Sequence, residues 1–132
     1  MILIDTNIIS EIMKRSPTKS VLNWINKQDT LSLYISTITL AEIRYGLRIM
    51  PQGQRKDNLS DHFSLFIAKA FEQRILSFNE DAAVNYAEIM GHRKETGKPM
   101  SVPDGQIAAI ARSNNFKIAT RNIRDFDECG LT

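Results

Sequence analysis

Three acidic residues that are far apart in the 132-residue sequence stand where their carboxylates could meet. Asp5 comes directly after the apolar run 2–4, Glu42 is expected in the first turn of the helix that follows a second apolar run, and Asp104 in the first turn of a later helix. Clustered carboxylates raise one another's pKa unless a cation neutralises them. Since hard oxygen ligands suit Mg²⁺ or Mn²⁺, the three acids predict a site for a divalent metal ion.

Each acid also has a structural interpretation. The segments 39–42 and 101–104 both match the capping box, in which an acidic side chain bonds back to the backbone of the cap residue. Acids in a first helical turn also complement the helix dipole. Asp5 could likewise cap the turn that follows its strand. Only the convergence of all three acids at one edge of a sheet would favour the metal site over these local roles.

The chemistry indicated by such a site is hydrolysis of phosphodiester bonds. Mg²⁺ held by carboxylates positions and acidifies an attacking water and offsets charge on the leaving oxygen, so no covalent nucleophile is needed. The sequence offers no Ser–His–Asp arrangement, no P-loop and no glycine-rich dinucleotide turn. His62 and His92 fall outside the acidic constellation and form no zinc pattern with the single cysteine, Cys129.

Short β-like runs alternate with longer helical patterns, which predicts an α/β fold with a mostly parallel sheet covered by helices on both faces. Ligands of such sheets bind at the carboxyl ends of the strands, where Asp5 falls. Ser16 and Pro17 are expected to open the second helix as cap and first helical residue. The expected strands are 2–4, 31–35, 75–78 and 117–120, and the expected helices are 8–14, 18–27, 39–50, 59–71, 80–96 and 101–115.

Length and composition predict one compact domain over residues 1–132, with the 42% hydrophobic and 24% charged residues of an ordinary globular protein. The first residues do not read as a signal peptide, and no stretch is long and apolar enough to cross a bilayer. A cytoplasmic protein without membrane contact is therefore expected. The net charge of +2 permits nucleic-acid binding but does not by itself predict it.

Four segments resemble, in order, the PIN-domain toxins of the VapC type, particularly the FitB-like branch. The segments are MILIDTNIISE, ISTITLAEIRYG, PDGQIAAIA and IATRNIRDF, and together they span essentially the whole chain. The resemblance implies a PIN-like three-layer sandwich with a central sheet of four to five strands. It further implies a metal-dependent endoribonuclease in which Asp5, Glu42 and Asp104 are catalytic, with Asp5 and Asp104 as ligands of Mg²⁺ or, in its place, Mn²⁺.

The same resemblance implies the partners. They are an RNA substrate and a small antitoxin, whose C-terminal segment lies across the active site and which often carries a DNA-binding domain that represses the shared operon. Operator DNA would then be contacted only through the antitoxin, and a homodimer or a larger toxin–antitoxin assembly is expected. Further residues are expected to support the site, namely Asn7, Thr120, Asn122 and Asp125, and to hold RNA phosphates, namely Arg121 and Arg124.

Asn122 departs from the family pattern, because many relatives carry a fourth acid at this position. Its carbonyl can still coordinate a metal but brings no charge, and Asp125 is the alternative. The lost charge should weaken a second metal site more than the first. A competing function is therefore a catalytically impaired PIN fold that binds RNA or its antitoxin. A phosphotransfer or receiver-like domain is a third interpretation, but the segment 5–7 lacks the second aspartate that a dehalogenase-like motif requires.

Overall fold

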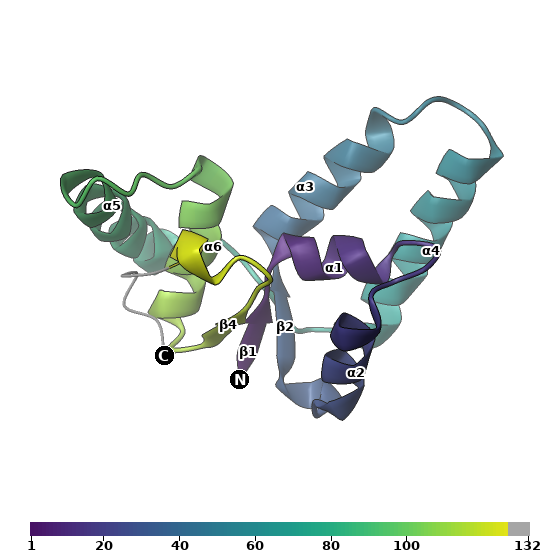
Figure 1. Ribbon diagram of the computed structural model, residues 1–132, viewed down its shortest axis with the longest axis horizontal. Coiled ribbons are helices and arrows are strands. Elements are labelled where there is room, and N and C mark those ends of the chain that lie inside the picture. Colours follow the sequence, from purple (N-terminus) through teal and green to yellow (C-terminus); the bar gives the residue numbers. More distant parts are fainter. Residues whose placement is uncertain (127–132) are drawn as a thin grey trace.

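A parallel sheet of four short strands lies at the centre of the molecule (Figure 1). The computed structural model describes residues 1–126, without the side chains of residues 124 and 125. The strands follow the order β3-β2-β1-β4 and all pair in parallel, which confirms the predicted α/β class. Their bounds are β1 (Ile2–Ile4), β2 (Leu33–Ser36), β3 (Ile75–Leu76) and β4 (Lys117–Ala119).

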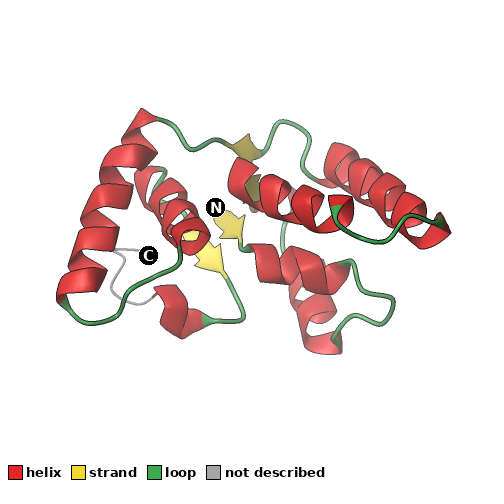
Figure 2. Ribbon diagram, turned by 90° about the horizontal axis from the view of Figure 1, so that it is seen from above, coloured by secondary structure: helices red, strands yellow, loops and turns green. Residues whose placement is uncertain are grey.

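Helices cover both faces of the sheet and complete the three predicted layers (Figure 2). One face packs against α1 (Thr6–Ile12), α2 (Lys19–Lys27), α3 (Thr37–Arg48) and α4 (Gln54–Ala70), and the other packs mainly against α5 (Glu80–Glu95) and α6 (Val102–Ser113). Two short 3-10 helices, η1 (Thr30–Ser32) and η2 (Ile123–Phe126), lie between these elements and at the end of the described chain. None of the helices within residues 1–126 has the length and apolar composition that crossing a membrane requires.

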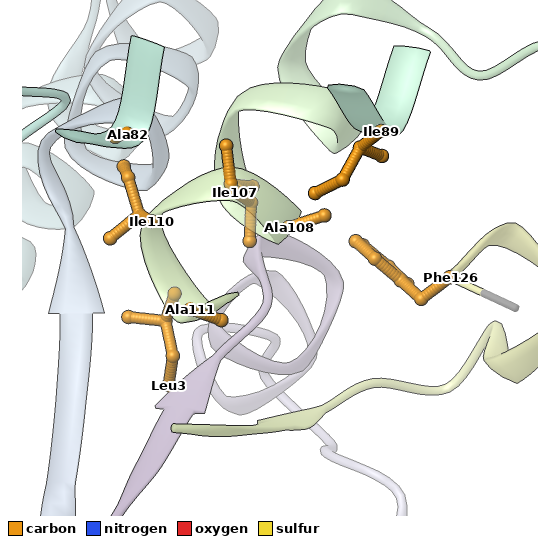
Figure 3. Close-up of a cluster of buried hydrophobic side chains, with 9 residues drawn as sticks. Leu3, Ala82, Ile89, Ile107, Ala108, Ile110, Ala111 and Phe126 are labelled. Atoms are coloured by element: carbon orange, nitrogen blue, oxygen red, sulfur yellow. The ribbon is translucent and has the colours of Figure 1, made fainter. Parts of the chain in front are cut away.

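Two hydrophobic cores sit on opposite sides of the sheet because successive side chains of a strand point to opposite faces. Leu3 joins the core formed with α5 and α6, and Ile4 joins the core formed with the four N-terminal helices. Figure 3 shows Leu3 beside Ile110 and Ala111 of α6, with Ile89 of α5 beyond them. Leu3 and Ile4 are both fully buried, so β1 contributes side chains to both cores.

Several predicted boundaries are wrong, three of them within the first 36 residues. The second strand covers 33–36 rather than 31–35, because its last two residues pair with β3. The first helix begins at Thr6, directly after its cap residue Asp5, instead of at residue 8. The second helix begins at Lys19 instead of Thr18, so Ser16 and Pro17 precede the helix and do not open it.

The core under α4 gives a direct test of the packing. Phe63 is fully buried, and its replacement by alanine should lower the free energy of unfolding by about 3–5 kcal/mol, since it removes buried apolar surface and leaves a cavity. Leu65 lies on the same helix but is 59% exposed, so Leu65→Ala should change stability by less than about 0.5 kcal/mol. Urea denaturation of both variants measures the difference, and equal losses would contradict this packing.

Candidate active site

Asp5 stands at the carboxyl end of β1, and both of its carboxylate oxygens are held. The backbone N–H of Asp5 continues the strand pairing by donating to the carbonyl of Ala119 at 2.9 Å. Beside it, the hydroxyl of Thr120 donates to Oδ2 at 2.8 Å, and the N–H of Thr6 donates to Oδ1 at 2.8 Å. Asp5 is also the N-cap of α1, and only 4% of its surface is exposed. The acid therefore caps a helix and faces the candidate site at once.

Glu42 is positioned by a chain of hydroxyls, two buried and one partly buried, that leads to it from the end of β2. The hydroxyl of Ser36 donates to Thr39 at 3.3 Å, Thr39 and Thr6 lie 2.9 Å apart, and Thr6 donates to Oε1 of Glu42 at 2.7 Å. Since each hydroxyl has one proton, the donation to Glu42 sets the direction of the whole chain. The predicted capping box at 39–42 is wrong: Ser36 caps α3, and Glu42 lies in the second turn.

Asp104 follows the N-terminal cap of α6, as predicted. The hydroxyl of Ser101 accepts a hydrogen bond from the N–H of Asp104 at 3.3 Å, and Pro103 occupies the first turn, where its missing N–H costs nothing. This local structure presents the Asp104 side chain at the start of the helix. The cap of α6 is therefore Ser101, and Asp104 stands in the first turn as expected.

The three acids line one cleft with a volume of about 430 Å³. A larger groove of about 610 Å³, between α2 and β4, is lined by none of them. The cleft also takes in three of the predicted supporting or RNA-binding residues, whereas the side chains of Arg124 and Asp125 lie outside the described residues. The lining residues are Asp5, Thr6, Asn7, Ser10, Glu11, Lys14, Glu42, Asp104, Arg121 and Asn122.

The electrostatics of the cleft favour a cation near Asp5. Burial raises the pKa of Asp5 to about 6; the charges of Asp104 and Glu42 also raise it, while the hydrogen bonds from Thr120 and Thr6 oppose the shift. Within residues 1–126 no three acidic, histidine or cysteine side chains lie close enough together to enclose a metal ion. The acids thus line an open cleft in which an ion would keep part of its water shell, as Mg²⁺ usually does.

The loop after β4 is held against α1 by the predicted supporting residues. Asn7 donates through Nδ2 to the hydroxyl of Thr120 at 3.4 Å and accepts the N–H of Arg121 at 3.4 Å through Oδ1. The N–H of Asn122 donates to the same threonine hydroxyl at 3.0 Å. Because that hydroxyl in turn donates to Asp5, Asn7 and Thr120 orient the strand-end acid from the far side of the loop.

The sequence analysis missed Glu11, a buried acid one turn after Asn7 on the same face of α1. It accepts hydrogen bonds from the N–H of Thr18 at 3.1 Å and from the hydroxyl of Thr18, and it pairs with Lys14 and Arg121. Hydrogen bonds from Lys14 and Thr18 lower the pKa of Glu11 to about 2. The spacing of four residues from Asn7 was the available signal, but the partners of Glu11 lie in the loop between α1 and α2 and in the loop after β4.

The raised pKa of Asp5 predicts a pH-dependent stability for the metal-free protein. Between pH 4 and pH 7 the unfolded chain releases the Asp5 proton before the folded chain does, so folding stability falls as pH rises. For a shift from 3.8 to about 6, the contribution lost is about 3 kcal/mol. Asp5→Asn removes this pH-dependent contribution. Urea denaturation in EDTA should therefore show that the free energy of unfolding of the variant, relative to that of the wild type, rises by about 3 kcal/mol between pH 4 and pH 7. A constant difference between the two proteins would contradict the shift.

Comparison with known proteins gives a consistent family. A model of the PIN domain matches residues 2–130. The chain is 42% identical to plasmid stability protein StbB of Pseudomonas syringae pv. tomato and 41% identical to VapC ribonuclease Y4jK of Sinorhizobium fredii, covering 99% of this chain and 94% of each relative. It is 37% identical to toxin FitB of Neisseria gonorrhoeae, over 96% of this chain and 91% of FitB.

The fold agrees with a solved structure as well. The crystal structure of FitAcB from Neisseria gonorrhoeae superposes with a TM-score of 0.93 at 36% identity, covering 100% of this chain and 95% of that one. The matching model, the curated relatives and this superposition each extend over nearly the whole sequence. The chain therefore belongs to the PIN-domain family.

Proposed function

We propose that this chain is a metal-dependent endoribonuclease and the toxin of a toxin–antitoxin pair. The observation that carries the proposal is the meeting of Asp5, Glu42 and Asp104, from three distant parts of the sequence, in one cleft at the carboxyl edge of the sheet. The similarity to proteins named toxin FitB and VapC ribonuclease supports RNA as the substrate class and toxicity as the biological role.

The donor set of the cleft fits Mg²⁺, with Mn²⁺ as a substitute. Asp5 and Asp104 would hold the ion through carboxylate oxygens, and the raised pKa of Asp5 indicates an acid that gains from a neighbouring cation. When bound, Mg²⁺ supplies acidification of an attacking water and offsets charge at the scissile phosphate. Neither histidine lines this cleft, and zinc would prefer nitrogen and sulfur ligands.

Other residues of the chain orient the two acids Asp5 and Glu42, and Glu42 accepts a proton. Thr6 and Thr120 fix the carboxylate of Asp5 so that it needs no reorientation when substrate arrives. The hydroxyl chain that ends on Oε1 holds Glu42 in one orientation. We assign to the other oxygen of Glu42 the hydrogen bond from the attacking water and acceptance of its proton. Such positioning and electrostatic preorganisation account for most of the catalysis of phosphoryl transfer.

The proposed partner is an antitoxin, through which the chain would contact operator DNA. This proposal rests on the family resemblance and on similarity to FitAB, which has been solved bound to an IR36 DNA fragment. The antitoxin would silence the nuclease by covering the acidic cleft. Purified protein must therefore be free of antitoxin before its activity is measured.

Cleavage of a mixed RNA pool tests the proposed function. In Mg²⁺ or Mn²⁺ the wild type should cut RNA, EDTA should stop it, and Asp104→Asn or Glu42→Gln should lower the rate at least about 100-fold, as expected when a group that stabilises the transition state is lost. Asp61→Asn on α4 and Glu88→Gln on α5 remove exposed acids outside the cleft and serve as matched controls. Full activity in the Asp104 variant would overturn the assignment.

A catalytically impaired binding module is the second candidate function, because Asn122 lines the cleft at a position where the family resemblance implies an acid. In that case clean, folded wild-type protein would bind RNA or antitoxin but cut nothing with either metal. The retained acids and the cation-favouring pKa of Asp5 support the nuclease over this alternative.

Asn122→Asp tests how much the missing acid matters. The substitution adds a negative charge to the cleft and should strengthen binding of a second metal ion more than the first, since the first is held by Asp5 and Asp104. Titration calorimetry with Mn²⁺ should show one tight site in the wild type and a second, detectable site in the variant. Identical isotherms would show that position 122 does not contribute to metal binding.

A further inference from the structure

The cleft has a basic end, formed by two cations that share one buried carboxylate. Oε2 of Glu11 lies 2.7 Å from Nζ of Lys14 and 3.3 Å from Nη1 of Arg121. The Glu11 side chain is 5% exposed, whereas the side chains of Lys14 and Arg121 are 62% and 45% exposed. All three residues line the same cleft as the metal-site acids. The two cations are thus anchored from beneath but open to a ligand.

The charge balance of this basic end favours an anion. Glu11 stays ionised at any working pH, so it cancels one of the two positive charges and leaves a net charge of about +1 at the basic end. The ion pair uses one nitrogen of Arg121, and the guanidinium has further N–H donors that suit a phosphate. The backbone of Arg121 is also fixed, because Asn7 accepts its N–H. The ion pair and this hydrogen bond reduce the freedom that Arg121 would lose on binding.

We infer that Lys14 and Arg121 form a phosphate subsite that takes the phosphodiester next to the scissile one, with Glu11 as its positioning residue. The inference rests on the proposed nuclease function, in which the scissile phosphate lies at the acidic end of the cleft. A strand of single-stranded RNA that runs through the cleft places its next phosphate at the basic end. The preferred substrate therefore contains at least two consecutive phosphodiesters.

A purely structural role is the competing explanation, because Glu11 also fastens the chain between α1 and α2 through Thr18. The two explanations differ in what the loss of one cation does. Lys14→Gln or Arg121→Gln alone leaves Glu11 paired with the other cation, so each single variant should fold. A structural role predicts that RNA binding is unchanged once folding is confirmed, whereas a phosphate subsite predicts weaker binding.

Binding in EDTA tests the subsite without metal or cleavage. Fluorescence anisotropy with a labelled ten-nucleotide single-stranded RNA should show each single variant weakened about tenfold, because each loses a charge-assisted hydrogen bond. The slope of log affinity against log salt should become shallower, by up to about 0.7 for each phosphate contact that is lost. Arg112→Gln is the matched control, since it removes an exposed ion pair with Glu88 outside the cleft. Wild-type affinity and slope in both single variants would overturn the inference.

A second measurement places the subsite next to the scissile bond. With Mg²⁺, Lys14→Gln should raise the KM for the ten-nucleotide RNA about tenfold and lower kcat/KM much less for a dinucleotide, whose single phosphodiester does not reach the subsite. Equal losses on both substrates would assign Lys14 to the structure of the site and overturn the subsite. If the wild type cuts neither RNA, the nuclease function fails, while the binding experiment in EDTA still decides whether the basic end holds a phosphate.

Discussion

The whole site depends on how the chain leaves β1. Leu3 and Ile4 are fully buried in two different cores, so the next residue has almost no freedom to move relative to the sheet. Asp5 inherits this rigidity, and its backbone N–H still pairs with β4. Placing an acid at such a position raises its pKa and lowers the stability of the empty site. A positively charged ligand bound beside Asp5 would offset this cost.

Much of this arrangement could be predicted from sequence, and the failures share one physical cause. The alternation of strands and helices, Asp5 at a strand end and the cap of α6 are local features, and the structure confirms them. The segment 36–42 allows two caps at a spacing of three residues, and the pairing of Ser36 with Leu76 in β3 decides between them. Local sequence patterns could not predict which residue caps α3, because this depends on residues forty positions away.

Glu11 illustrates the same limit for the candidate site. Its side chain is buried where Lys14 and Thr18, from the loop between α1 and α2, and Arg121, from the loop after β4, converge on it. In the sequence it is an ordinary acid in an amphipathic helix. The structure instead gives the cleft two ends of opposite charge, with the acids near β1 and the cations near the end of α1. A polyanion would fit the basic end, and a divalent cation held by the acids would offset their charge at the other end.

The strands of the sheet are only two to four residues long, and this brevity bears on how such a protein can diverge. Alignment at the carboxyl edge comes from a few short side-chain hydrogen bonds, among them the hydroxyl chain from Ser36 to Glu42, rather than from an extended ladder. Mutational drift in the outer helices therefore leaves the edge in register as long as those small polar side chains persist. A lineage can thus exchange most of its surface, and with it its binding partners, while inheriting the same acidic edge.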